Sequence, residues 1–119
     1  MIENQLEGGE RMEQEMYMDL VSGILRALPS QVIRIVLYGS VARGTDTPES
    51  DVDIAVFVHA RLDAEMEDRL SEVVVDMNLK YDKVFSVIDI ENATYQKWRD
   101  VTPFYQNVDR EGIILWTAA

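Results

Sequence analysis

Residues 37–58 read LYGSVARGTDTPESDVDIAVFV, and this stretch decides how the chain folds. Its first glycine, Gly39, follows an apolar, β-branched run over residues 32–38, and a second such run covers residues 52–58. Continuous apolar runs of this length are typical of buried strands. Residues 39–50 between them are rich in Gly, Ser, Thr, Asp and Pro, so we expect a loop with one helical turn at 41–43.

The rest of the chain carries helical and strand patterns on both sides of this stretch. Apolar residues recur every three or four positions in two amphipathic helices, and proline and glycine mark where elements end. The expected elements are a helix over 10–28, a helix with an apolar stripe from Leu62 to Met77, a strand over 84–90, a helical region over 91–107 that Pro103 divides, and a short strand after Gly112. This order predicts an α/β layered domain with one main sheet.

Length and composition limit the possibilities further. The 119 residues suffice for one domain, and we expect a flexible tail over 1–9 and a single domain over 10–119. The absence of cysteine excludes disulfides, thiolate metal sites and a cysteine nucleophile. No apolar run approaches the roughly 18 residues of a bilayer span, and no apolar secretory signal is visible. These features favour a cytoplasmic protein without membrane contact.

Acidic residues outnumber basic ones, with 22 Asp and Glu against 11 Lys and Arg, for a net charge of -11. A chain this acidic repels free nucleic acid unless cations intervene, so we expect no direct nucleic-acid partner. A solvated acidic surface explains most of this charge. Metal ligation and a basic protein partner are the two alternatives that composition leaves open.

The stretch between the two apolar runs contains groups suited to phosphate and metal. Gly39 permits a positive φ and close approach of a ligand, and Ser40 stands at an expected helix start, where free N–H groups hold phosphate oxygens. Arg43 is a candidate phosphate contact. Asp51 and Asp53 point to the same face of a strand, which is costly unless a cation such as Mg²⁺ lies between them.

Each of these features also has an ordinary explanation. A Gly-Ser pair is usually a turn, an Asp-x-Asp at a strand start is often solvated, and a single arginine is usually a surface residue. The joint arrangement of a strand, Gly-Ser, ten residues and Asp-x-Asp before a second strand favours adjacent phosphate and metal sites.

This arrangement resembles a known family. Gly-Ser, ten residues and Asp-Val-Asp resemble the GS(x10)DxD signature of nucleotidyltransferases of the DNA polymerase beta type. The segments GSVARG and SDVDIAVFV, together with the short length of the chain, are similar to those of the minimal nucleotidyltransferase group. The order of elements extends the resemblance over about residues 10–116. It implies a polymerase beta-like α/β fold, with a mixed sheet of about four strands packed with helices.

The resemblance implies an activity and a set of site residues. The family transfers a nucleotidyl group from a nucleoside triphosphate to a hydroxyl with two Mg²⁺ ions. Asp51 and Asp53 would be catalytic and hold the metals. The residues expected to bind the nucleotide, which would be ATP, are Gly39, Ser40, Arg43 and Ser50.

The third strand departs from the family pattern, which places a further carboxylate there. Residues 85–90 have the sequence FSVIDI, in which Ser86 occupies that position. Asp89 is the remaining candidate for the third catalytic acid, although three residues further along a regular strand it faces the other way. A bulge would bring it round. Without a third acid, a single-metal, nucleotide-binding or slow enzyme is the alternative.

Three functions follow from the resemblance. Minimal nucleotidyltransferases are similar to the antitoxin of HEPN/MNT toxin–antitoxin pairs, which implies AMP transfer from ATP to a tyrosine of a HEPN-type toxin within a hetero-oligomer. The second function is neutralisation of that toxin by binding alone, and an acidic surface suits a basic, RNA-cutting partner. The third is modification of a small molecule such as an aminoglycoside, for which the chain leaves little sequence to build an acceptor pocket.

Overall fold

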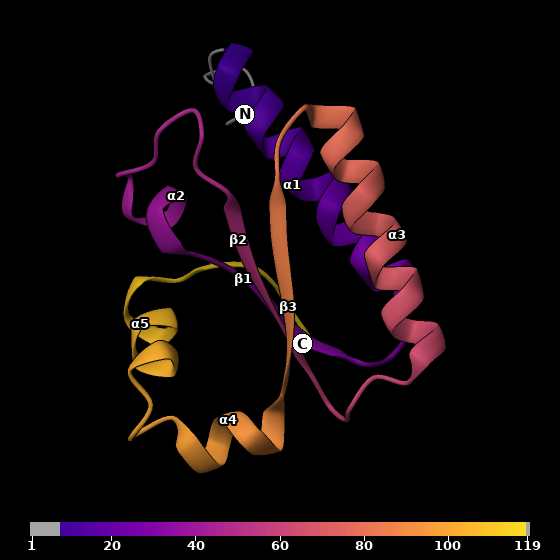
Figure 1. The fold of residues 1–119 in the computed structure, drawn as a ribbon, viewed down its shortest axis with the longest axis vertical. Helices are drawn as coiled ribbons and strands as arrows, with labels where there is room; N and C mark the ends of the chain where they lie inside the picture. Colours follow the sequence, from indigo (N-terminus) through magenta and orange to yellow (C-terminus); the bar gives the residue numbers. More distant parts are fainter. Residues whose placement is uncertain (1–7, 119) are drawn as a thin grey trace.

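The computed structural model describes residues 8–118 of the chain (Figure 1). Within this range the elements are α1 (Gly8–Ala27), β1 (Val32–Tyr38), α2 (Gly39–Arg43), β2 (Val52–Val58), α3 (Ala64–Tyr81), β3 (Phe85–Glu91), α4 (Asn92–Trp98), α5 (Pro103–Glu111) and β4 (Ile113–Thr117). The predicted order of helices and strands is confirmed, and β1 and β2 have the predicted bounds. No helix in this part of the chain has the length and hydropathy needed to cross a membrane.

The four strands form one mixed sheet in the order β3-β2-β1-β4. β1 is antiparallel to β2 and β4, whereas β2 and β3 are parallel. A parallel pair needs a crossover connection, and α3 supplies it. α2 and the following loop connect the antiparallel β1 and β2, so the end of β1 lies beside the start of β2. Tyr38 and Asp53 are paired there, which places the Gly39 turn next to an aspartate.

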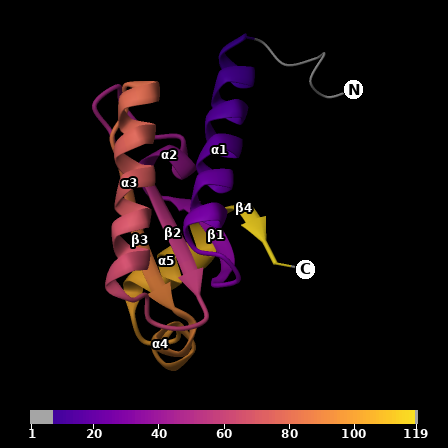
Figure 2. The ribbon, with the colours of Figure 1, turned by 90° about the vertical axis from the view of Figure 1, so that its right-hand side faces the viewer.

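Helices cover both faces of the sheet (Figures 1 and 2). α1 and α3 lie side by side on one face, where Gly23 permits close packing: a Cβ on Gly23 would stand 2.9 Å from Cγ1 of Val73. The fully buried residues of this larger core include Leu20, Ile24, Leu28, Ile35, Ile54, Val56 and Val58. α4 and α5 cover the other face, where their Tyr95 and Val108 pack with Val36, Ala55, Phe57 and Ile90 of the sheet. Burial of each large apolar side chain stabilises the fold by about 1.5–3 kcal/mol.

α1 begins earlier than predicted. Gly8 and Gly9 belong to the helix rather than separating it from a tail. A glycine costs about 1 kcal/mol relative to alanine inside a helix, but adding a residue to an existing helix is far easier than nucleating one. Residues 1–7 lie outside the described residues, so the tail stays a prediction for them.

The predicted break at Pro103 is confirmed. Pro103 is the first residue of α5, where a missing N–H is tolerated and the fixed φ suits a helix. Thr102 before it is extended, with φ -99° and ψ 114°, as a residue preceding proline prefers. The break lets α5 turn back across the sheet toward α2 (Figure 1).

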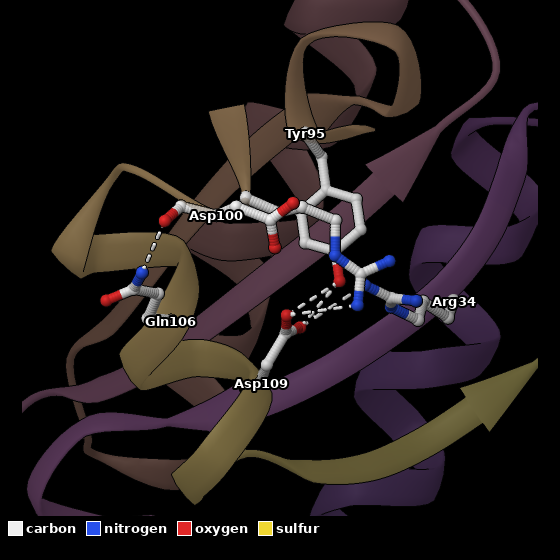
Figure 3. A network of polar contacts seen from close by, with 6 residues as sticks. Arg34, Tyr95, Asp100, Gln106 and Asp109 are labelled. Atoms are coloured by element: carbon white, nitrogen blue, oxygen red, sulfur yellow. Dashed lines mark hydrogen bonds and ion pairs between the residues drawn. The ribbon is translucent and has the colours of Figure 1, made fainter. Parts of the chain in front are cut away.

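A polar network fastens α4 and α5 to β1 (Figure 3). The hydroxyl of Tyr95 lies 2.7 and 2.8 Å from the two carboxylate oxygens of Asp109 and donates to them. Arg34 and Arg99 approach the same carboxylate at 3.9 and 3.7 Å. The Arg34 guanidinium also lies 4.0 Å from the centroid of the Phe57 ring. These contacts fix α5, which forms one wall of the site described next.

Candidate functional site

The turn from β1 into α2 brings backbone against a carboxylate. Gly39 has φ +77°, a left-handed conformation that favours glycine. A Cβ at this position would clash with the carboxylate of Asp53. Tyr38, at the N-cap of α2, makes no side-chain capping hydrogen bond. The first turn of α2, which includes Ser40, thus presents backbone N–H groups that no N-cap side chain accepts from.

The loop after α2 is closed by its own hydrogen bonds. Gly44, at φ +74°, ends the helix, and its N–H donates to the carbonyl of Val41 at 3.1 Å. Further along, the N–H of Thr47 donates to Oγ of Ser50 at 2.9 Å, and the N–H of Ser50 donates to the carbonyl of Thr47 at 3.0 Å. Ser50 therefore closes the turn that delivers the chain to Asp51, and its predicted contact with nucleotide stays a prediction.

Asp51 lies immediately before β2, and Asp53 is the second residue of that strand. Asp51 is exposed and Asp53 is half-buried. Burial raises the pKa of the Asp53 carboxyl above its ordinary value, the charge of Asp51 raises it further, and the Arg43 guanidinium opposes both. Burial, with a smaller contribution from Asp53, also raises the pKa of the Tyr38 phenol. The site thus concentrates negative charge where desolvation makes that charge costly.

Arg43 is positioned by α5. Its guanidinium forms an ion pair with Glu111 at 3.1 Å, and side-chain exposures of 47% and 27% show that the pair is open to solvent. Arg43 is also near enough to Asp53 to lower the pKa of that carboxyl. The structure therefore brings together Gly39, Arg43 and Asp53 of the predicted site, and it adds Glu111.

A small cavity of about 180 Å³ opens beside this group, between α2 and α5. Its lining residues are Tyr38, Gly39, Arg43, Phe104, Asn107, Val108 and Glu111. The rings of Tyr38 and Phe104 meet edge to face, 5.5 Å between centroids. Sequence reasoning did not place Phe104 or Glu111 at the site, because nothing local connects them to residues so far back in the chain.

Asp89 does not join the other two aspartates. The pairing of β2 with β3 runs without a register shift, so the bulge that its catalytic role requires is absent. Asp89 is opposite Val56, which belongs to the core under α1 and α3. It lies near Glu67 of α3, where burial and then the charge of Asp89 raise the pKa of the Glu67 carboxyl. This placement corrects the prediction that Asp89 is a catalytic partner of Asp51 and Asp53. The residue of β3 that is paired with Asp53 is Ser86.

The donor set suits a hard divalent cation. A cation beside Asp51 and Asp53 would relieve the repulsion that raises the pKa of Asp53, and carboxylate oxygens are ligands that Mg²⁺ prefers. Among the side chains that the structure describes, no three of His, Cys, Asp or Glu are grouped so that they could hold a metal. Side chains therefore supply two acidic ligands, and phosphate oxygens and water would complete the coordination of Mg²⁺.

A known protein family matches the part of the chain that contains Gly39, Asp51 and Asp53. The nucleotidyltransferase domain model matches residues 18–106. A protein of Methanocaldococcus jannaschii, provisionally named a protein adenylyltransferase, is 30% identical over 99 residues, which cover 83% of this chain and 94% of that protein.

Solved structures share the fold. The crystal structure of a toxin–antitoxin complex with AMP-PNP contains a chain that is 25% identical, with a TM-score of 0.57, and the match covers 83% of this chain and 72% of that one. A complex of tri-AMPylated Shewanella oneidensis HEPN toxin with MNT antitoxin contains a chain that is 22% identical, with a TM-score of 0.54 and coverage of 88% and 73%. At that identity, the second likeness shows the fold alone. The predicted mixed sheet packed with helices is confirmed.

Proposed function

Because this chain belongs to the nucleotidyltransferase domain family, we propose that it transfers AMP from ATP to a hydroxyl of a partner protein. One observation carries the proposal: the Gly39 turn and the Asp53 carboxylate are in contact at the junction of β1 and β2. This junction offers phosphate-binding N–H groups and metal-binding carboxylates at the same place. ATP and a protein acceptor are supported by the adenylyltransferase name of the 30% identical relative.

The residues of the site divide the work between phosphate and metal. The N–H groups at Gly39 and Ser40 donate to the terminal phosphates, and Arg43 adds a positive charge. Asp51 and Asp53 hold Mg²⁺, which when bound neutralises charge on the triphosphate and favours attack at the α-phosphorus. Ionisation of Asp53 is a condition for this role; the Arg43 guanidinium favours the ionised form, against the burial and the Asp51 charge that oppose it.

The bonds that change are those of ordinary phosphoryl substitution. The acceptor oxygen forms a bond to the α-phosphorus, and its proton passes to water. The bond from the α-phosphorus to the oxygen bridging to the β-phosphorus breaks, and pyrophosphate leaves. The residues of the site bind and orient the triphosphate for this displacement.

The acceptor in this proposal is a tyrosine of a HEPN-type toxin, and this chain is its antitoxin. The 25% identical neighbour is part of a toxin–antitoxin complex with AMP-PNP, which supports a toxin as the partner and an adenine nucleotide as the substrate. The net charge of -11 suits a basic, RNA-cutting partner, because complementary charge accelerates and orients encounter.

A second candidate function is neutralisation by binding without transfer. An apolar groove of about 470 Å³ separates α1 from β4, and Tyr17, Met18 and Trp116 contribute to its walls. β4 is an edge strand (Figure 2), and Ile114 on it is 61% exposed. An apolar edge strand is a ready site for a partner's strand. Two exposed acids of α1 lie beside groove residues, Glu13 near Tyr17 and Glu15 near Met18, and favour the basic toxin as its occupant.

The test of transfer uses a HEPN-type protein encoded in the same genome, incubated with this chain, Mg²⁺ and ATP labelled at the α-phosphate. We expect label on the partner, and none when the label is at the γ-phosphate. The Asp51→Asn, Asp53→Asn double variant should abolish labelling. The matched control, Asp68→Asn with Asp76→Asn, removes two exposed acids of α3 and should retain it. Labelling that persists in the Asp51, Asp53 variant would overturn the proposed site.

A further inference from the structure

Beside Asp53, β3 carries the hydroxyl of Ser86 rather than a carboxylate. Ser86 on β3 is paired with Asp53 on β2, and residues paired across neighbouring strands point to the same face. Neighbouring strands are about 4.8 Å apart, so the half-buried Ser86 is the side chain of β3 that accompanies Asp53. It carries no charge at neutral pH.

The structure offers no substitute for the missing charge on β3. The register between β2 and β3 is continuous from Val52 with Phe85 to Val58 with Glu91. Asp89 therefore stays on the α3 side of the sheet, beside Glu67. Glu111, the other acid of the site, is paired with Arg43 at 3.1 Å. Among the described residues this leaves Asp51 and Asp53 as the unpaired acids of the junction, and no group of three or more metal-binding side chains is present.

Charge balance then limits how many cations the side chains can hold. Two Mg²⁺ ions at the separation of about 3.5–4 Å used in two-metal catalysis repel strongly. Ligands of opposite charge must offset that repulsion, and here the side chains contribute two negative charges. Mg²⁺ is commonly bound by one or two carboxylates together with substrate phosphates. The nucleotide completes one such site, whereas a second cation, on the acceptor side, would lack a side-chain carboxylate of its own.

We infer that this chain binds one divalent cation with its nucleotide, and that Ser86 is the residue that excludes a second. This inference rests on the proposed nucleotide site and concerns its metal content alone. Its consequence is that the acceptor hydroxyl is activated without a metal ion bound by this chain, so transfer is slower than a Ser86→Asp variant would allow.

The test counts bound Mn²⁺, used in place of Mg²⁺, by electron paramagnetic resonance. The purified full-length chain is saturated with α,β-methylene-ATP, which resists cleavage at the reacting bond. We expect one bound Mn²⁺ per chain for the wild type and for Ser86→Ala. Ser86→Asp should bind two, with the spectral broadening of a coupled pair. Ser71→Asp, which adds the same charge at an exposed position of α3, should bind one.

Each outcome has a distinct meaning. Two Mn²⁺ ions on the wild type would overturn the inference while leaving nucleotidyl transfer intact. One Mn²⁺ on a folded Ser86→Asp variant would overturn the assignment to Ser86. Ser86→Glu offers the same test if the aspartate variant does not fold. No Mn²⁺ and no nucleotide on the wild type would instead contradict the proposed function, on which the inference rests.

Discussion

Gly39 lies directly against the carboxylate of Asp53, so closely that a methyl group at Gly39 would overlap it. Gly39 also holds φ +77°. An alanine there incurs backbone strain of about 1–2 kcal/mol and pushes the Asp53 side chain out of place. We expect Gly39→Ala to lower the free energy of unfolding by at least that amount and to reduce Mg²⁺–ATP affinity more than tenfold. Urea unfolding and calorimetric titration measure the two effects.

Gly44→Ala is the matched control for this prediction. Gly44 has nearly the same φ, +74°, but a Cβ there would meet no atom within 4 Å. It should show the strain in stability and leave nucleotide affinity within about twofold. Equal losses of affinity in both variants would mean that strain, rather than contact with Asp53, explains the effect.

Asp53→Asn should stabilise the protein at neutral pH while preventing Mg²⁺ binding. The pKa of Asp53 is raised by burial and then by Asp51, so its ionised form is disfavoured in the folded state. That penalty is present above the folded-state pKa and disappears as pH falls below the ordinary carboxyl range near 4. We expect a gain below about 1 kcal/mol at pH 7, discounted for exposure, and none at pH 3. A variant less stable than wild type at pH 7 would refute this.

Arg43 and Glu111 allow stability to be separated from nucleotide binding. Their ion pair at 3.1 Å is partly exposed, so a double-mutant cycle of Arg43→Gln and Glu111→Gln should give a coupling energy below about 1 kcal/mol. Arg43→Gln should weaken Mg²⁺–ATP binding about tenfold, or 1.4 kcal/mol. Glu111→Gln should preserve or improve it, because a negative charge near the phosphates is lost. Equal weakening in both variants would indicate that the pair acts only by holding α2 to α5.

The hydrogen bond from Tyr95 to Asp109 should hold α4 against α5. Tyr95→Phe keeps the ring, which packs 5.0 Å from Phe57 and 5.7 Å from Tyr105 between centroids, and removes the hydroxyl at 2.7 Å from Asp109. We expect a loss of about 1–2 kcal/mol in the free energy of unfolding. A loss below about 0.3 kcal/mol would show that packing of the ring, and not this bond, fixes the helices.

The apolar edge offers a variant that affects binding alone. Ile114→Lys places a charge at the groove between α1 and β4 and should weaken the complex with the HEPN-type protein at least tenfold. Val75→Lys introduces the same change at an apolar residue of α3 that is 54% exposed, and should have no effect. Both variants should retain ATP affinity. If Ile114→Lys leaves the complex unchanged, the partner does not cover this groove.

The sequence predicted the parts of the fold that local patterns determine. β1 and β2 were expected over residues 32–38 and 52–58 and lie there, because β-branched runs bounded by turn residues leave little freedom. The break at Pro103 follows from the ring itself. Asp89 faces the other side of the sheet from Ser86, as the alternation of side chains along a strand predicts.

Other features of the site depend on contacts between distant residues. The pair of Arg43 with Glu111 spans 68 positions, and the approach of Phe104 to Tyr38 depends on how α5 turns back over the sheet. Ser50 was expected to bind nucleotide, and its hydroxyl accepts a hydrogen bond within its own turn. These arrangements depend on strand order and helix packing, which local sequence patterns do not predict.

The most direct test of AMP transfer is the intact mass of the HEPN-type partner after incubation with this chain, Mg²⁺ and ATP, with pyrophosphate measured in parallel. The proposal predicts a mass gain of one or more AMP groups, one pyrophosphate released for each, and neither with the Asp51→Asn, Asp53→Asn variant. A partner that binds the wild-type chain with its mass unchanged would contradict transfer.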